Sequence, residues 1–317
     1  MSSRHLVLIL LVVVVWGANF TVIKVGLADV PPMLLAALRF AVVAFPAVFV
    51  VPRPNVPGKY WIAYGLAVGV GQFGALFYAM DMGVPAGVAS VVMQSQAFFT
   101  IPLAALWLNE RVLPVQLTGM AVAALGLSVI GSDSGHPATL DIPVAGLFLC
   151  LAGAACWGVA NIVVRLASAS AASRGDRLDM LGLIVWSSLV PPVPLLGLAL
   201  LLHGSDGIMN ALEGFGWRAV LAVGFLAFGA TLFGFGVWSK LLSMYPASRV
   251  APFSLLVPVT GVLTARIALG EQLTRGQWFG SALVVLGLII ATSSLARRPG
   301  ARRPALAVSG ARASARR

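Results

Sequence analysis

The chain has 317 residues, of which 59% are hydrophobic and only 10% are charged. A soluble globular domain carries about a quarter of its residues as Asp, Glu, Lys and Arg, because these residues cover an apolar core in water. The composition therefore excludes a soluble fold and indicates a surface that faces lipid. A net charge of +11 would suggest a nucleic-acid partner in a soluble chain. Most of these cations fall in alternate connecting segments and in the tail at 297–317, so we expect no nucleic-acid partner.

Long apolar runs follow one another along the chain, separated by charged, proline-rich or polar segments. A helix needs about 20 residues to cross roughly 30 Å of hydrocarbon. Backbone amides in lipid must be hydrogen-bonded internally, and these runs are too long and continuous for barrel strands. The sequence therefore predicts an all-α integral membrane protein. Its ten predicted transmembrane helices cover 6–26, 32–51, 61–81, 86–108, 115–131, 143–166, 180–202, 217–242, 249–269 and 277–295.

The positions of Lys and Arg predict the side of the membrane that each connection faces, since cytoplasmic loops carry an excess of these residues. Both termini fall on the basic side, so we expect them in the cytoplasm. The tail at 297–317 is expected to be disordered there and to contact anionic lipids. The basic side holds Arg4, Arg53, Lys59, Arg111, Arg174, Arg177, Arg249 and the tail, and the other side Lys24, Arg218 and Arg275.

An internal repeat divides the chain into two related halves. The stretch WGANFTVIK at 16–24 matches WGVANIVVR at 157–165. Five spans per half is an odd number, so the second half enters the membrane from the opposite side, which is typical of secondary transporters. The predicted units are a first repeat at 1–140, an inverted second repeat at 141–296 and the basic tail at 297–317. A second match, at one common offset, aligns Glu110, Gln116, Gly119 and Leu125-Gly126-Leu127 with Glu271, Gln277, Gly280 and Leu286-Gly287-Leu288.

The asparagines of the repeat are not equivalent. Asn19 aligns with Ala160, and Asn161 lies one position later. One position turns a side chain by about 100° around a helix. We therefore expect the two amides to have different partners.

The chain resembles the ten-helix EamA family of the drug/metabolite transporter superfamily over nearly its whole length except the tail. Within that family it is most similar to the branch that exports O-acetylserine and cysteine. The resemblance implies export of cysteine-pathway metabolites and related amino acids from the cytoplasm. The stretches that carry it are LLVVVVWGANFTVIKVGL at 10–27, PPMLLAALRF at 31–40, PAGVASVVMQSQAFFT at 85–100, IVWSSLVP at 184–191 and RVAPFSLLVPVTG at 249–261.

Two arginines lie inside predicted spans, where insertion of an Arg costs about 2.5–3.5 kcal/mol. Such a residue persists where it meets water, a carboxylate or an anionic ligand. Arg39 is the stronger candidate, because a zwitterionic amino acid needs a cation for its carboxylate. Arg266 lies near the end of its span, so snorkelling to the interface is the alternative. Arg165 is a weaker candidate, with interface anchoring as its alternative.

Neutral amides and aromatic side chains complete the predicted substrate site. Amides can bond both groups of a zwitterion and cost less to bury than ions. Gln94 and Gln96 are two positions apart, so we expect only one of them to face a cavity. Simple helix packing is the alternative for all of these residues. The amides are Asn19, Gln72, Gln94, Gln96 and Asn161, and the aromatic residues are Trp16, Tyr78, Trp157 and Trp238.

Several other features favour structural roles. Glu110 and Glu271 are expected at helix starts, where the helix dipole favours a carboxylate. The motif Gly69-Val-Gly-Gln-Phe-Gly74 has no preceding strand, so it predicts a packing face rather than a nucleotide site. Cys150 and Cys156 are expected to pack in the interior. No nucleotide-binding lysine motif, metal-ligand cluster or catalytic triad can be assembled, so we expect no enzyme, cofactor or metal.

The sequence thus predicts a secondary-active or facilitative exporter that works by alternating access, as a monomer or a homodimer. Asp81 is the nearest candidate for proton coupling, with an interfacial cap as its alternative. The other function left open is export of another class of small molecule, such as nucleobases, sugars or toxic compounds. A non-transport membrane scaffold or intramembrane enzyme is the remote alternative.

Overall fold

The computed structural model describes residues 2–132 and 143–296, and the regular secondary structure of these residues is helical, without a strand. The predicted loop at 133–142 and the tail at 297–317 lie outside the described residues. The described helices form ten segments, which confirms the predicted all-α fold. In chain order they are α1 (Ser3–Gly26), α2 (Pro32–Ala47), α3–η1–α4 (Gly58–Gly65, Leu66–Gly74, Ala75–Asp81), α5–η2–α6 (Ala86–Val92, Met93–Ser95, Gln96–Leu108), α7 (Pro114–Ser132), α8 (Val144–Ala172), α9 with α10 (Met180–Ser187, Pro192–Glu213), α11–η3–α12 (Trp217–Gly224, Phe225–Phe233, Gly234–Met244), α13–η4–α14 (Ala247–Val250, Ala251–Leu256, Val257–Leu269) and α15 (Arg275–Ala296).

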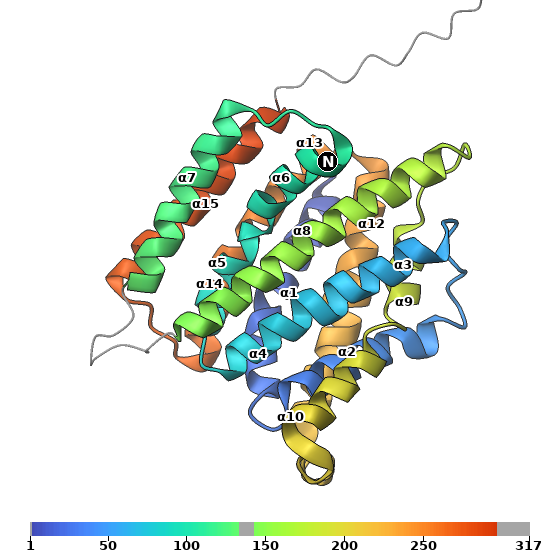
Figure 1. Ribbon diagram of the computed structural model, residues 1–317, viewed down its shortest axis with the longest axis vertical. Helices are drawn as coiled ribbons and strands as arrows, with labels where there is room; N and C mark the ends of the chain where they lie inside the picture. Colours follow the sequence, from blue (N-terminus) through green and yellow to red (C-terminus); the bar gives the residue numbers. More distant parts are fainter. Residues whose placement is uncertain (1, 133–142, 297–317) are drawn as a thin grey trace, which may run out of the picture.

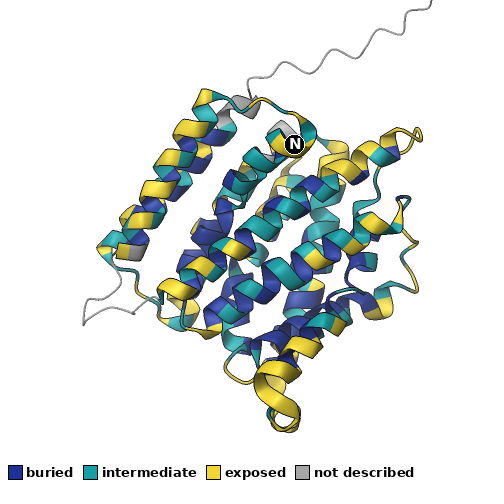
Figure 2. Ribbon diagram, in the orientation of Figure 1, coloured by how far each residue is buried: buried dark blue, intermediate teal, exposed yellow. Residues whose placement is uncertain are grey.

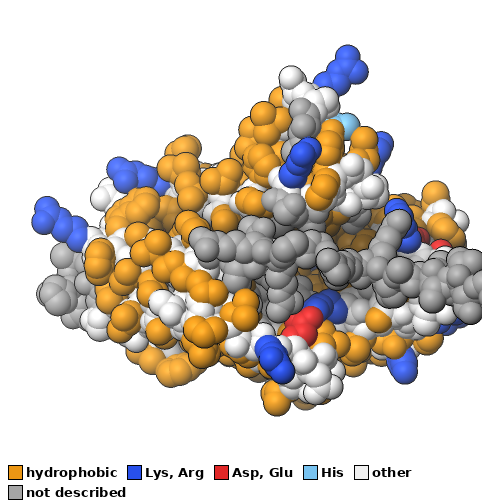
Figure 3. Space-filling view, turned by 90° about the horizontal axis from the view of Figure 1, so that it is seen from above, with side chains coloured by type: hydrophobic (Ala, Val, Ile, Leu, Met, Phe, Trp, Pro, Cys, Tyr) orange, Lys and Arg blue, Asp and Glu red, His pale blue; other side chains and the backbone are white. Residues whose placement is uncertain are grey.

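Most of these segments are long and apolar enough to cross a membrane. Within the described residues, 8 candidate spans meet that description, and the shorter apolar helices Pro32–Ala47 and Pro114–Ile130 supply the other two segments. Figure 3 shows a surface covered mostly by hydrophobic side chains, with charged side chains in small groups. Such a surface is stable against lipid and not against water.

Helices α7 and α15 lie side by side at one edge of the molecule (Figure 1). A Cβ atom on Gly119 would lie 2.5 Å from the carbonyl oxygen of Gly287, and one on Gly126 would lie 2.5 Å from that of Gly280. The residue number rises from Gly119 to Gly126 along α7, while that of the contacted residue falls from Gly287 to Gly280. The two helices are therefore antiparallel. The glycines that align in the sequence repeat therefore bring α7 and α15 into backbone contact.

Each half also contains a π-helical segment in its third span. Segments η1 and η3 are both 9 residues long and begin directly after a glycine, Gly65 or Gly224. Short 3-10 segments, η2 and η4, occur in the fourth span of each half. Mid-helix π and 3-10 geometry is uncommon and is frequent at functional sites. The repeat thus places irregular backbone at matching positions in the two halves.

The glycines of the repeated Trp-Gly pair allow close helix crossings. A Cβ atom on Gly17 of α1 would lie 2.7 Å from the backbone nitrogen of Gly261 in α14. A Cβ atom on Gly158 of α8 would lie 3.2 Å from the backbone nitrogen of Thr100 in α6. Each half therefore contributes one such crossing to the central bundle.

The glycine motif at 69–74 forms a packing face, as the sequence indicates. A Cβ atom on Gly69 would lie 2.0 Å from the Pro191 side chain, and one on Gly71 would lie 2.6 Å from Cys156 Sγ. Cys150 is fully buried in the core, and Cys156 is half-buried.

Hydrogen bonds show which segments share an end of the bundle. At one end of the bundle, Asn55 Nδ2 donates to the carbonyl of Arg177 (2.8 Å), joining the segment after α2 to the segment after α8. At the other end, Lys24 Nζ donates to the carbonyl of Met80 (2.7 Å), joining the ends of α1 and α4. We call these the basic end and the opposite end, since most Lys and Arg of the connecting segments lie at the first.

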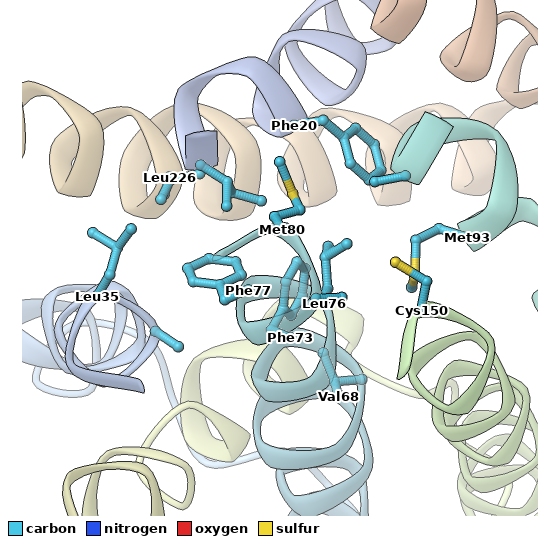
Figure 4. Packing of buried hydrophobic residues seen from close by; sticks show 14 of the residues in the cluster. Phe20, Leu35, Val68, Phe73, Leu76, Phe77, Met80, Met93, Cys150 and Leu226 are labelled. Atoms are coloured by element: carbon cyan, nitrogen blue, oxygen red, sulfur yellow. The ribbon is translucent and has the colours of Figure 1, made fainter. Parts of the chain in front are cut away.

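Buried residues gather where α1, α2, α4 and η3 meet (Figure 2). Figure 4 shows Phe77 and Met80 of α4 close to Leu35 of α2, Phe20 of α1 and Leu226 of η3. Phe77, Met80 and Leu35 each have an exposed fraction of 0%. These three side chains are therefore closed off from solvent.

Candidate functional site

Arg39 of α2 is buried in the interior with an exposed fraction of only 2%. Its Nη1 donates to Asn19 Oδ1 of α1 (3.3 Å), and its Nη2 donates to Thr231 Oγ1 of η3 (3.1 Å). The guanidinium carbon lies 3.9 Å from the centre of the Phe73 ring in η1. A stacked, desolvated cation–π contact of this kind contributes about 2 kcal/mol. Helices from both halves therefore hold the guanidinium in place.

Within the described residues, no carboxylate forms an ion pair with this cation. The ion pair found in that part of the chain joins Arg165 to Glu110. The Nε atom of Arg39 is buried and lacks a hydrogen-bond partner in the same part of the chain. A buried charge without a counter-ion is costly, because neutral dipoles replace its hydration only in part. Arg39 therefore retains both positive charge and an unused donor for an anionic group.

A small cavity of about 20 Å³, room for about one water molecule, lies beside the guanidinium. Small-molecule sites are typically apolar cavities with a few placed polar groups. The lining residues come from four spans: Arg39 and Phe40 of α2; Tyr64, Gly65, Val68, Gly69 and Phe73 of α3 and η1; Ile184, Ser187 and Ser188 at the end of α9; and Thr231 and Phe235 of η3 and α12.

Hydroxyl groups supply the other polar atoms of the lining. Ser187 and Ser188 both donate to the carbonyl of Ile184, at 2.9 and 2.7 Å. Their protons are thus used within the helix, and their oxygen lone pairs remain available as acceptors. Tyr64 is buried on the facing span. The cavity thus combines one cation with neutral hydroxyls.

Trp16 of α1 packs behind the lining of this cavity. Its indole Nε1 donates to the carbonyl of Ala230 (2.9 Å), the residue before Thr231. Its ring packs on Phe235 and Trp238, with ring centres 5.2 and 5.0 Å apart. Phe235 is itself a cavity residue, so Trp16 and Trp238 support the lining from behind.

Asn161 lies in a separate polar cluster between α8 and α6. Its Nδ2 donates to Gln96 Oε1 (2.6 Å) and to Thr100 Oγ1 (3.1 Å). Asn19, in contrast, accepts from Arg39. The expectation that the two asparagines have different partners is confirmed. Gln96 belongs to this second cluster and not to the lining of the Arg39 cavity.

Four of the predicted site residues are placed between helices, outside that lining. Gln72 and Gln94 are buried, and Tyr78 and Trp157 are half-buried against the main core. Gln72 matches Thr231 in position, because each is the seventh residue of its π segment. Its Oε1 has no hydrogen-bond partner in the described part of the chain.

Three further candidates lie at the periphery. Arg165 forms a bidentate pair with Glu110, with side chains 43% and 39% exposed. Arg266 is exposed in the last turn of α14, as snorkelling requires. Asp81 is exposed at the end of α4. None of the three lines the Arg39 cavity.

The structure changes the interpretation of Glu271. Its carboxylate accepts hydrogen bonds from the backbone N–H groups of Ala86 (2.8 Å) and Gly87 (3.0 Å) at the start of α5. The expectation that it begins its own helix is wrong, because α15 begins only at Arg275. The dipole argument holds, but it applies to a helix that is distant in sequence.

Sequence reasoning missed Thr231, Tyr64, Ser187 and Ser188. Small hydroxyl residues are common in transmembrane helices as packing residues, so composition alone does not distinguish them. A usable signal for Thr231 is its match with Gln72 in the third span of each half. Comparing the polar residues of the two third spans would have identified it.

The comparisons with known proteins agree with this architecture. The chain matches the EamA-like transporter family over residues 3–132 and 144–293. It belongs to this family. A protein of known crystal structure is 20% identical with a TM-score of 0.58, covering 94% of this chain and 100% of its own, which supports the fold alone.

Relatives of this EamA-like transporter are named for export. Proteins named "Probable amino-acid metabolite efflux pump" are 46% identical over 292 residues in Salmonella typhimurium and 44% identical over 290 residues in Escherichia coli. Each match covers 92% of this chain and 95% of the relative. A protein from Streptantibioticus cattleyicolor named "Probable terminal-alkyne amino-acid exporter" is 28% identical over 313 residues, or 95% of this chain and 98% of its own. Family and relatives identify a multi-pass membrane transporter of small molecules.

Proposed function

We propose that this chain exports small amino-acid metabolites, such as cysteine, O-acetylserine and related amino acids, across the bacterial inner membrane. The Arg39 cavity is the observation that carries the proposal. It offers a buried cation without a carboxylate partner among the described residues, in a space built by both halves. The names of the relatives that cover most of the chain support the same substrate class.

In this proposal the substrate carboxylate binds the guanidinium of Arg39. Charged hydrogen bonds of this type are about twice as strong as neutral ones. Asn19 and Thr231 fix two of the guanidinium nitrogens and leave Nε for the ligand. The hydroxyl oxygens of Ser187 and Ser188 accept from the substrate amino group.

The positions of the cavity and the core favour a state in which the opposite end is closed. Along the third span, cavity residues extend from Tyr64 to Phe73, and the fully buried Phe77 and Met80 follow toward the opposite end. At 1.5 Å per residue, the second group lies some 10–20 Å farther along the helix axis. By the positive-inside rule the basic end faces the cytoplasm. We therefore infer a cavity nearer the cytoplasm, with Phe77 and Met80 closing the outer path until the two halves rearrange.

Transport by the purified protein tests the function. Full-length protein in liposomes should exchange internal unlabelled cysteine or O-acetylserine for the labelled external compound, and protein-free liposomes should not. An Arg39→Gln variant should lose exchange by about 100-fold, the size of losing one buried charged partner. Arg218→Gln, which removes an exposed arginine at the start of α11, is the matched control and should exchange normally.

The outcomes separate the proposal from the alternative substrates. Absence of exchange for a panel of amino acids, together with exchange of nucleobases, sugars or toxic compounds, would refute amino-acid export. Normal exchange by folded Arg39→Gln would refute the role of Arg39. The pH and voltage dependence of the flux then decides between ion coupling and facilitated diffusion.

A further inference from the structure

A cluster of basic and aromatic side chains lies at the basic end of the bundle, and none of its members lines the Arg39 cavity. We propose that this cluster binds an anionic phospholipid, whose headgroup phosphate is held by Arg53 and Trp61 beside the start of α3. The cluster is built by α3, α9 and the segment after α2, and α3 and α9 lie side by side (Figure 1). The proposal goes beyond the exported substrate and does not depend on it.

Two tryptophans form the base of the cluster. Trp61 of α3 and Trp186 of α9 meet edge to face, with ring centres 6.3 Å apart. Trp186 Nε1 donates to the carbonyl of Val51 (3.1 Å), which attaches the segment after α2 to α9. A candidate membrane span begins at Gly58, one turn before Trp61. The indoles therefore lie at the level of the membrane interface, where Trp is enriched.

The cluster contains an unused hydrogen-bond donor. Trp61 Nε1 is buried and has no hydrogen-bond partner in the part of the chain that the structure describes. A Cβ atom on Gly58 would lie 3.7 Å from this nitrogen and 3.5 Å from Nη2 of Arg53. The two donors thus lie around one point at the first residue of α3, which has no side chain to fill it. Because a buried donor without an acceptor is unfavourable, an oxygen bound here removes a cost.

The charges around this point favour an anion. Arg53 and Lys59 are exposed, and neither forms an ion pair within the described residues. The carboxylates of the segment after α8 bind locally: Asp179 caps its own helix, α9, and Asp176 accepts from the backbone N–H of the next residue. The N-cap of α3 is Pro57, which supplies no side-chain acceptor to the helix start. Cationic donors beside the positive end of a helix dipole are typical of phosphate sites.

Exposed apolar side chains beside the cations favour a lipid over a soluble phosphate. Phe49 and Val50, directly before the anchored Val51, are 79% and 82% exposed. The Phe49 ring packs against Phe45, which is also exposed, with ring centres 6.2 Å apart. This surface suits acyl chains, whereas a free phosphate would use only the donors. By the positive-inside rule this end faces the cytoplasmic leaflet, whose anionic lipids are attracted to Lys and Arg.

Lipid titration of the purified full-length protein in detergent tests the proposal. The melting temperature is measured with phosphatidylglycerol, with phosphatidylcholine of the same acyl chains, and with glycerol phosphate, which has no chains. Phosphatidylglycerol should raise the melting temperature, because a ligand of the folded state stabilises it. Phosphatidylcholine should need an at least about fivefold higher concentration for the same effect, since its headgroup has no net charge. Glycerol phosphate should have no effect at these concentrations.

Variants locate the site. Trp61→Phe keeps an aromatic ring and the net charge but removes the N–H, so the midpoint of the phosphatidylglycerol titration should rise about tenfold. Arg53→Gln should raise it about fivefold. Arg111→Gln, which removes the same charge from another exposed position at the basic end, is the matched control and should leave the midpoint unchanged. If Trp61→Phe does not fold, Gly58→Ala fills the point between the donors without contacting any atom closer than 3.5 Å, and it should also raise the midpoint.

The results distinguish a built lipid site from its alternatives. A raised midpoint in Trp61→Phe or Gly58→Ala and in Arg53→Gln, with a normal one in Arg111→Gln, supports the proposal. Equal stabilisation by phosphatidylcholine overturns the preference for an anionic lipid, and equal stabilisation by glycerol phosphate makes the ligand a soluble anion. Equal losses in Arg53→Gln and Arg111→Gln would mean attraction by diffuse charge, and a normal midpoint in Trp61→Phe would remove the indole from the site. Either result overturns the proposal.

Discussion

Arg39 on α2 donates a hydrogen bond of 3.1 Å to the hydroxyl of Thr231 in η3, 192 residues away. The same hydroxyl donates to the carbonyl of Leu226 (2.8 Å), five residues earlier in the π segment. Thr231 therefore connects the irregular backbone of the second half to the cation of the first half. Movement of η3 relative to α2 would change the environment of the guanidinium, and thereby its affinity for an anion.

Replacing Thr231 by Val should weaken substrate binding while the fold is kept. Val has nearly the same shape but cannot accept from Arg39, and a lost hydrogen bond to a charged group costs about 1.5–3 kcal/mol. The apparent KM for exchange should rise by about tenfold or more, as this energy predicts. Thr231→Ser retains the hydroxyl and should restore most of the affinity. Equal KM values for both variants would contradict the role of the hydroxyl.

Replacing Glu271 by Ala should lower thermal stability through a helix that is distant in sequence. The carboxylate caps two backbone N–H groups of α5, and loss of a helix cap costs about 1–2 kcal/mol. The melting temperature in detergent should fall, and Glu271→Gln should show a smaller decrease because its amide oxygen still accepts. Glu213→Gln, at the exposed end of α10, is the control. An unchanged melting temperature for Glu271→Ala would show that water replaces the cap.

Replacing Gly126 by Val should disrupt the contact between α7 and α15. A Cβ atom at Gly126 would lie 2.5 Å from the carbonyl oxygen of Gly280, which is backbone and cannot turn aside. Overpacking of this kind costs about 1–3 kcal/mol. Gly197→Val in α10, where no atom lies within 4 Å of the added Cβ, is the matched control. Comparing unfolding in denaturant for the two variants measures the effect, and equal losses would contradict the close contact.

The pair formed by Asn161 and Gln96 should contribute little to stability but should couple α8 to α6. Interhelical hydrogen bonds within membranes contribute about 0.6 kcal/mol on average and at most about 1.7. A double-mutant cycle with Asn161→Leu and Gln96→Leu should therefore give a coupling energy in this range. A coupling of zero would mean that each amide finds another partner when the first is removed.

Most of the fold is predictable from the sequence because the bilayer restricts it. The requirement for internal backbone hydrogen bonds makes long apolar runs helical, and the distribution of Lys and Arg orients them. The two internal matches identify the halves, whereas the contact between their glycines in α7 and α15 is known only from the structure. Arg39 stands out because a cation in the middle of a span is costly to insert and is therefore rare unless it has a function.

The partners of the polar side chains depend on tertiary structure. Asn19 and Asn161 occupy nearly equivalent places in the repeat, yet one meets Arg39 and the other meets Gln96, because a single position turns the side chain toward a different neighbouring helix. Glu271 caps α5 rather than its own helix, since helix ends from distant parts of the chain meet at the same end of the bundle. Sequence alone thus determined the all-helical membrane fold, and it predicted the relation of the halves and the role of Arg39. Only the packing of those helices decided that Thr231, Ser187 and Ser188 share its cavity, because that depends on the rotation and neighbours of each helix.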